Sequence, residues 1–216
     1  MKKFTILLFL FNILLFSNES PAQNNTNDQK YIYKKGDYNG IGKWYMGREI
    51  AYVMGYEGIG WLERSQREKE ENVSKLIQNM GIRPNDTIAD IGAGSGYHAF
   101  RMAPLANKGM VYAVDIQTEM LMAIENSKET NNIKNIKTIL GGEKSVYLAK
   151  NSVDKILMVD VYHEFSFPIE MIKSITIALK PKGELFLIEY RGEDPNVPIK
   201  RIHKMTEKQA VKEMEA

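Results

Sequence analysis

Three glycines at alternate positions limit how this chain folds more than any other feature. Gly92, Gly94 and Gly96 lie in the stretch ADIGAGSGYHAF (residues 89–100), directly after a short apolar run. Glycine permits backbone conformations that other residues avoid, and it lets a ligand approach the main chain closely. A helical pattern follows, and the free N–H groups at the start of a helix favour an anionic group. We therefore predict a strand, a tight turn and a helix arranged around a ligand.

From residue 87 onward, short apolar strands alternate with helices. This alternation is typical of a parallel sheet covered on both faces. The predicted fold class is α/β: a Rossmann-like, doubly wound, mostly parallel sheet with helices on both faces. We predict strands at 87–91, 110–115, 136–140, 154–161 and 184–190, and helices at 97–103, 119–127, 168–179 and 206–216, the last with Thr206 as its N-cap.

The chain before this core divides into three predicted parts. Residues 1–22 are predicted to be an export signal, and residues 23–43 are predicted to be a linker or irregular segment. Residues 44–81 are predicted to be largely helical, and we interpret them as a helical lid on the α/β core at 87–216. The helices predicted in this lid are 48–55 and 61–81.

Three lid residues are candidates for closing over a ligand: Tyr45, Arg48 and Trp61. An alternative for Trp61 is that it only anchors its helix to the core. The charged run at 64–71 is expected to form a solvated helix face.

The first residues, MKKFTILLFLFNILLFSNESPAQ, carry two lysines, then an apolar run, then small residues at positions 20 and 22. This pattern predicts cleavage after Ala22 and an exported or periplasmic protein. The alternative is an uncleaved N-terminal anchor. The apolar run at 4–16 is too short to span a bilayer comfortably, so we expect no stable membrane span.

The composition excludes several kinds of site and partner. The 216 residues have a formal net charge of +2, so no basic footprint indicates a nucleic acid. The chain contains no cysteine. Disulfides, thiolate metal ligands and a cysteine nucleophile are therefore excluded.

The spacing of the glycines limits the classes of ligand that this turn can bind. Tyr97 and His98 stand where a triphosphate-binding loop needs lysine and serine or threonine, and the pattern G-x-G-x-G differs from the dinucleotide pattern G-x-G-x-x-G. The second strand ends in Asp115, 19 residues after Gly96, where a carboxylate can accept bonds from ribose hydroxyls. S-adenosylmethionine meets this description, whereas a nicotinamide cofactor is disfavoured.

At this point the sequence resembles class I S-adenosylmethionine-dependent methyltransferases. The segments ADIGAGSGY, VYAVDIQ and VDKILMVDVYHEF carry the resemblance, which covers the chain from about Trp44 to the C-terminus. It implies that Asp115 binds the ribose, that Ile116 packs on the adenine, and that Glu143, where aspartate is more usual, contacts the adenine amine. The residues implied to hold the methionine part are Asp90, Gly92, Gly94 and Gly96, and Asp160 would face both cofactor and acceptor.

Methyl transfer is an in-line displacement, for which the protein aligns the acceptor and excludes water. The predicted end of the fourth strand projects Asp160, Tyr162, His163 and Glu164 toward the cleft. His163 is the candidate base because its ordinary pKa lies near neutral. The alternative is that His163 caps the next helix or bonds a carbonyl.

Two further residues, Tyr190 and Arg191, are candidates for the acceptor pocket, and Arg191 alternatively pairs with Glu193. The histidines His98, His163 and His203 lack the spacing of known metal motifs, so we expect no metal site.

The resemblance implies seven strands, of which we count five. The strand at 184–190 is then an open apolar edge, which predicts a homodimer through that edge. The acceptor is expected to be a small molecule or a protein, without further identification. Export is in tension with a cofactor made in the cytoplasm, so a second hypothesis is a non-catalytic exported protein that binds an adenosyl ligand.

Overall fold

The computed structural model describes residues 30–216, so the predicted export signal and residues 23–29 of the predicted linker lie outside the described residues. The core is a five-stranded parallel sheet with the order β6-β5-β4-β7-β8. This order confirms the predicted Rossmann-like fold class, because the chain crosses from one side of β4 to the other between β6 and β7. The strands are β4 (Thr87–Ile91), β5 (Met110–Asp115), β6 (Ile136–Leu140), β7 (Val153–Val159) and β8 (Leu179–Ile188).

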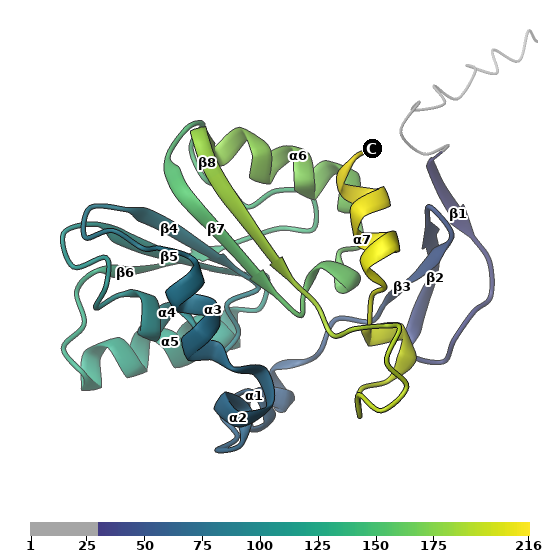
Figure 1. The fold of residues 1–216 in the computed structure, drawn as a ribbon, viewed down its shortest axis with the longest axis horizontal. Coiled ribbons are helices and arrows are strands. Elements are labelled where there is room, and N and C mark those ends of the chain that lie inside the picture. Colours follow the sequence, from purple (N-terminus) through teal and green to yellow (C-terminus); the bar gives the residue numbers. More distant parts are fainter. Residues whose placement is uncertain (1–29) are drawn as a thin grey trace, which may run out of the picture.

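Helices cover both faces of the sheet (Figure 1). Because side chains alternate along a strand, Ile88 of β4 packs into one core cluster and its neighbour Ala89 into the other. The first cluster includes side chains of α3, α4 and α5, and the second those of α6 and α7. These helices are α3 (Val73–Asn79), α4 (Ala99–Met102), α5 (Thr118–Thr130), α6 (Pro168–Ala178) and α7 (Glu207–Met214), and Thr206 caps α7 as predicted by accepting the Gln209 amide at 3.1 Å.

The N-terminal part of the chain differs from the prediction. It forms a three-stranded antiparallel sheet in place of the irregular segment 23–43 and the helix 48–55, so both predictions are wrong for the described residues. The cause is a two-residue turn at Met46 and Gly47, whose φ angles of 48° and 105° suit a tight hairpin. The strands are β1 (Tyr31–Tyr33), β2 (Gly40–Tyr45) and β3 (Arg48–Ala51).

The predicted helix at 61–81 is three shorter helices, α1 (Ile59–Leu62), α2 (Arg67–Glu71) and α3. Asn72 separates α2 from α3 with a left-handed φ of 51°. The charged run is also not a simple solvated face. Arg67 is only 4% exposed, and its guanidinium donates to the Glu71 carboxylate and to the Leu62 carbonyl, both at 2.9 Å.

The small sheet is fixed to the second face of the core. Tyr31 donates its hydroxyl to Glu170 of α6 at 2.6 Å and meets the ring of Phe167 edge-on. Arg48 of β3 forms a two-pronged ion pair with Glu213 of α7, at 2.8 and 3.0 Å. These contacts place the segment that follows β3 beside the carboxyl end of the large sheet.

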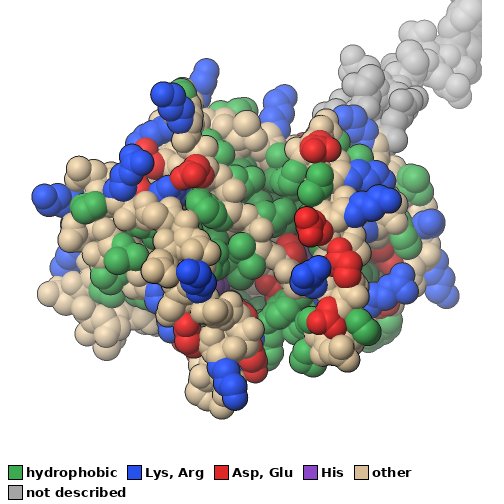
Figure 2. All heavy atoms as spheres, viewed as in Figure 1, with side chains coloured by type: hydrophobic (Ala, Val, Ile, Leu, Met, Phe, Trp, Pro, Cys, Tyr) green, Lys and Arg blue, Asp and Glu red, His purple; other side chains and the backbone are tan. Residues whose placement is uncertain are grey.

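Among residues 30–216, no helix is both long and apolar enough to cross a membrane. Basic, acidic and hydrophobic side chains are interspersed over the face shown in Figure 2. Within the described part, β8 pairs only with β7 and therefore forms one edge of the sheet. Ile188 on this strand is 38% exposed.

We predict that this edge supports a homodimer. Exposed apolar strand edges pair readily with other strands, and a lysine on such an edge opposes pairing. Light scattering of the purified chain should give the mass of a dimer, and the Ile188→Lys variant should give the mass of a monomer. A wild-type chain that is monomeric and melts cooperatively contradicts the prediction.

Candidate active site

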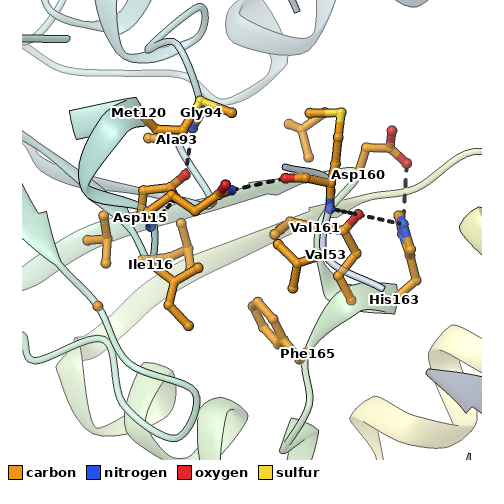
Figure 3. A pocket seen from close by; sticks show the side chains of 18 of the residues that line it. Val53, Ala93, Gly94, Asp115, Ile116, Met120, Asp160, Val161, His163 and Phe165 are labelled. Atoms are coloured by element: carbon orange, nitrogen blue, oxygen red, sulfur yellow. Dashed lines mark hydrogen bonds and ion pairs between the residues drawn. The ribbon is translucent and has the colours of Figure 1, made fainter. Parts of the chain in front are cut away.

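A cavity of about 390 Å³ opens at the carboxyl ends of β4, β5 and β7. This volume falls within the range of small-molecule sites. Figure 3 shows Gly94, Asp115 and Ile116 on one side of it and Asp160 and His163 on the other. The predicted site residues that line it are Gly92, Gly94, Asp115, Ile116, Glu143, Asp160 and His163, whereas Asp90, Gly96 and Tyr162 do not.

The three glycines are required by the backbone itself. Gly92, Gly94 and Gly96 have φ angles of 70°, 53° and 83°, a region that side chains disfavour. A Cβ atom on Gly92 would also lie 2.3 Å from a methyl group of Val161, and one on Gly94 would lie 2.6 Å from a methyl group of Leu62. The motif therefore shapes the cavity floor independently of any ligand.

Asp115 is held rigidly at the end of β5. Its Oδ2 accepts the Gly94 amide at 2.8 Å, and its Oδ1 accepts the Gln117 amide at 2.9 Å. Burial raises the pKa of this carboxyl group, while the backbone bonds oppose the rise. Each carboxylate oxygen keeps a second lone pair for a ligand hydroxyl. Beside it, Ile116 is 43% exposed and offers an apolar surface.

Asp90 lies beneath the cavity and is 2% exposed. Its Oδ2 has no hydrogen-bond partner among the described residues. Burial raises the pKa of Asp90 to about 7. His98, which does line the cavity, also has a buried ring nitrogen without a partner, and burial lowers its pKa to about 3. Buried polar atoms without partners are rare. Because His98 lines the cavity, its ring nitrogen can face a polar ligand, whereas Asp90 does not line the cavity.

His163 is the centre of a hydrogen-bonded chain. Its Nδ1 lies 2.7 Å from Glu189 Oε2, and its Nε2 lies 3.0 Å from His203 Nδ1. Burial acts to lower the pKa of His163, but the bond to Glu189 and the surrounding carboxylates outweigh it and raise this pKa. The ring neither caps a helix nor bonds a carbonyl, so that alternative is wrong.

Tyr162 is fully buried and turned away from the cavity, contrary to the prediction that it faces the cleft. Its hydroxyl donates to Glu213 at 2.8 Å. Arg48, paired with the same Glu213, also donates to the His163 carbonyl at 3.0 Å. These residues fix the His163 backbone from behind and touch no ligand space.

Asp160 follows β7 with a left-handed φ of 54°, an uncommon conformation for a residue other than glycine. Its Oδ1 is buried without a hydrogen-bond partner among the described residues and lies 3.8 Å from His163 Nδ1. Burial raises its pKa to about 7, with Glu189 and Glu164 adding to the rise and His163 opposing it. Strained backbone of this kind is concentrated at functional sites.

The segment after β3 lines the cavity with Val53 and Met54 and lies within residues 44–81, which were predicted to form a lid. The Met54 amide donates to Glu164 Oε1 at 3.0 Å, and the Met54 carbonyl accepts Gln117 Nε2 at 3.0 Å. Of the three predicted lid residues, Trp61 lines the cavity and is 37% exposed, whereas Tyr45 and Arg48 do not line it.

The two candidates for the acceptor pocket, Tyr190 and Arg191, follow β8 in the chain. Neither lines the cavity. The Tyr190 hydroxyl bonds Glu71 at 2.9 Å, and Arg191 is exposed. Glu193 accepts the Glu207 amide at 2.7 Å. Sequence reasoning missed Arg67, Glu189 and Met54, because their roles depend on contacts between distant segments.

The chain matches a known family over residues 82–215, more than half of its length. The matching family model is described as a methyltransferase domain. The chain therefore belongs to this family of methyltransferase domains. A SAM dependent methyltransferase from Aquifex aeolicus shares the fold with a TM-score of 0.71 and 24% identity, over 76% of this chain and 87% of that one.

Two curated relatives are similar over shorter stretches. A tRNA U34 carboxymethyltransferase of Desulfotalea psychrophila is 29% identical over 118 residues, which are 55% of this chain and 37% of that protein. A probable cobalt-precorrin-6B C(15)-methyltransferase (decarboxylating) of Methanosarcina mazei is 26% identical over 88 residues, which are 41% of this chain and 48% of that protein. The chain thus spans less than half the length of these relatives.

We predict that Asp90 makes stability depend on pH. Because its folded pKa of about 7 exceeds the ordinary 3.8, the folded state holds this proton more tightly, and stability falls as pH rises from 3.8 to about 7 and levels off above it. The free energy of unfolding of Asp90→Asn, relative to that of the wild type, should therefore be about 1–3 kcal/mol higher at pH 8 than at pH 5. Urea unfolding at both pH values measures this, with Glu129→Gln on the exposed end of α5 as control. An equal gain at both pH values contradicts the prediction.

Proposed function

We propose that this chain is an S-adenosylmethionine-dependent methyltransferase that transfers a methyl group by in-line displacement to a small-molecule or protein acceptor. The observation that carries the proposal is the position of Asp115. Its carboxylate is locked by the Gly94 amide at the edge of a 390 Å³ cavity, whose other side carries His163. The family match supports the same activity.

The residues around the cavity fit this cofactor. Asp115 offers two carboxylate oxygens to the ribose hydroxyls, and Ile116 offers an apolar surface to the adenine. The turn at Gly92 and Gly94, which lines the cavity, would hold the methionine part, and Glu143, which also lines it, would contact the adenine amine. Asp90 precedes this turn in the chain but does not line the cavity. When bound, the cofactor supplies a methyl group already activated on a sulfonium.

The acceptor is proposed to enter beside His163 and Asp160, opposite Asp115. His163 in this corner is buried and fixed, since it is 1% exposed and is held by Glu189. Such rigidity aligns an acceptor and excludes water, which are the main needs of methyl transfer. The two curated relatives are named for very different acceptors, a tRNA and a precorrin, so the acceptor class is open.

A second candidate is an exported protein that binds an adenosyl ligand without catalysis. It is favoured by the predicted export signal at residues 1–22, since the cofactor is made in the cytoplasm. Methyl transfer to a component of a cell extract, measured with labelled cofactor, distinguishes the two: transfer supports the enzyme, and binding without transfer supports the second candidate.

We expect S-adenosylhomocysteine to bind with one site per chain in calorimetric titration. Asp115→Ala should lower the affinity for S-adenosylhomocysteine about 5-fold to 150-fold, which corresponds to about 1–3 kcal/mol for lost hydrogen bonds to a buried carboxylate. A matched control is Asp154→Ala, since Asp154 accepts the Thr87 amide at 2.8 Å at the opposite end of the sheet. Unchanged affinity in Asp115→Ala, or binding of NADH in its place, contradicts the proposal.

We also propose that the chain is exported and cleaved after Ala22. Expression of the full sequence in a bacterial host should then place the protein in the periplasmic fraction, with an N-terminus at Gln23 by mass spectrometry. An intact N-terminus on protein recovered from the cytoplasm would refute export, and an intact N-terminus in the membrane fraction would support the uncleaved anchor.

A further inference from the structure

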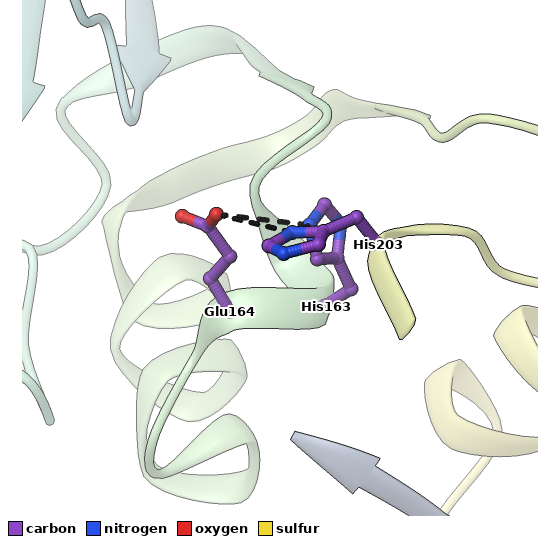
Figure 4. A group of neighbouring side chains, drawn as sticks. All are labelled: His163, Glu164 and His203. Carbon is purple, nitrogen blue, oxygen red and sulfur yellow. Dashed lines mark hydrogen bonds and ion pairs between the residues drawn. The ribbon is translucent and has the colours of Figure 1, made fainter. Parts of the chain in front are cut away.

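Two histidines and a glutamate converge at one corner of the cavity. Figure 4 shows one oxygen of Glu164 facing the rings of both His163 and His203. His163 Nε2 lies 3.0 Å from His203 Nδ1. Glu164 Oε1 lies 3.8 Å from the first of these nitrogens and 3.6 Å from the second. Three potential metal-donor atoms therefore form a compact triangle with edges of 3.0, 3.6 and 3.8 Å.

The size of this triangle matches the coordination of a metal ion. Its circumradius, calculated from edges of 3.0, 3.6 and 3.8 Å, is about 2.0 Å, so a point equidistant from all three atoms lies at the usual zinc–nitrogen and zinc–oxygen bond length. Two such bonds in a tetrahedral arrangement separate their donor atoms by about 3.3 Å. The observed edges fall around this value.

A hydrogen bond between the two rings explains only part of the arrangement. It accounts for the 3.0 Å contact, but the separations of 3.6 and 3.8 Å from Glu164 exceed hydrogen-bond length. Glu164 is nevertheless held in place, because its Oε1 accepts the Met54 amide at 3.0 Å. A cation at the centre of the triangle would contact all three groups at once.

The surroundings of His163 prepare it to bind a cation. Glu189 Oε2, 2.7 Å from Nδ1, can only accept when ionised, so Nδ1 carries the proton and Nε2 presents a lone pair to the triangle. Glu189 is itself fixed, since its other oxygen accepts the Tyr162 amide at 2.9 Å. A carboxylate bonded to the far nitrogen of a histidine is the usual support of a metal ligand.

We propose that His163, Glu164 and His203 hold a divalent transition-metal ion of the Zn²⁺ class, with an open coordination position toward the cavity. Two imidazoles and one carboxylate suit this class of ion better than Mg²⁺ or Ca²⁺, which prefer oxygen ligands alone. Three protein ligands with an open fourth position are typical of catalytic sites. All three residues line the cavity that contains Asp115, so the open position faces the ligand space.

This proposal reverses the expectation from the sequence, which found no metal-binding spacing. His163 and His203 are 40 residues apart and come together only because the 3₁₀ turn at Arg201–His203 packs on the one at Tyr162–Glu164. The metal site does not depend on the proposed methyl transfer, and the two fail separately.

The test is metal binding by the full chain, purified with a tag that contains no histidine and stripped with a chelator. We expect one Zn²⁺ per chain by elemental analysis after dialysis, and visible d–d absorption when Co²⁺ is added instead. The chain contains only three histidines and no cysteine, so few other groups can bind these ions. A folded wild-type chain that retains no Zn²⁺ and gives no Co²⁺ absorption overturns the proposal.

Variants locate the site. His203→Gln should lower the affinity for Zn²⁺ at least ~100-fold. Glu189→Gln should lower it about 10-fold to 100-fold, because Glu189 supports His163. The matched control is His98→Gln, the third histidine, which lines the same cavity but lies outside the triangle and should bind Zn²⁺ as wild type does. Equal Zn²⁺ affinity in wild type and His203→Gln overturns the proposal. Titration of the same samples with S-adenosylhomocysteine shows whether cofactor binding survives loss of the metal. If His203→Gln does not fold, the Co²⁺ spectrum of wild type decides.

Discussion

The hydrogen bond from the Gly94 amide to the Asp115 carboxylate is the contact on which the site depends. It joins the turn after β4 to the end of β5, and the amides of Gly92 and Ala93 reinforce it by donating to the Val114 carbonyl at 2.8 and 3.0 Å. Two neighbouring parallel strands are thereby locked at their carboxyl ends. The cavity floor and the carboxylate that we assign to the ribose are thus one rigid unit.

The opposite wall is assembled from segments far apart in the sequence. His163 follows β7, Glu189 follows β8, and His203 lies in a later turn, yet the three form one hydrogen-bonded chain. The small N-terminal sheet and the segment after it support this wall, because Arg48 of β3 donates to the His163 carbonyl and the Met54 amide donates to Glu164. The sheet and the segment after it therefore support the wall that carries His163 and Glu164, in addition to the contacts of the sheet with α6.

The sequence predicted the parts that depend on local pattern. The five strands of the core, the positive φ angles at the glycines and the placing of Asp115 follow from strand periodicity and from the restricted conformations of the chain. It missed the hairpin at Met46 and Gly47, because the helical spacing of residues 48–55 competed with the turn signal. It also missed the pairing of His163 with Glu189 and His203, which arises only when separate strand ends meet. Arg67 was misread because it packs against a distant segment: its guanidinium carbon lies 4.4 Å from the centre of the Tyr97 ring.

A crystal structure of the chain soaked with S-adenosylhomocysteine tests the central claim most directly. The account predicts both ribose hydroxyls within hydrogen-bond distance of the Asp115 carboxylate, with the sulfur facing the corner formed by Asp160 and His163. An empty notch at Gly94, or a nucleoside bound elsewhere with Asp115 still occupied only by backbone amides, would contradict it.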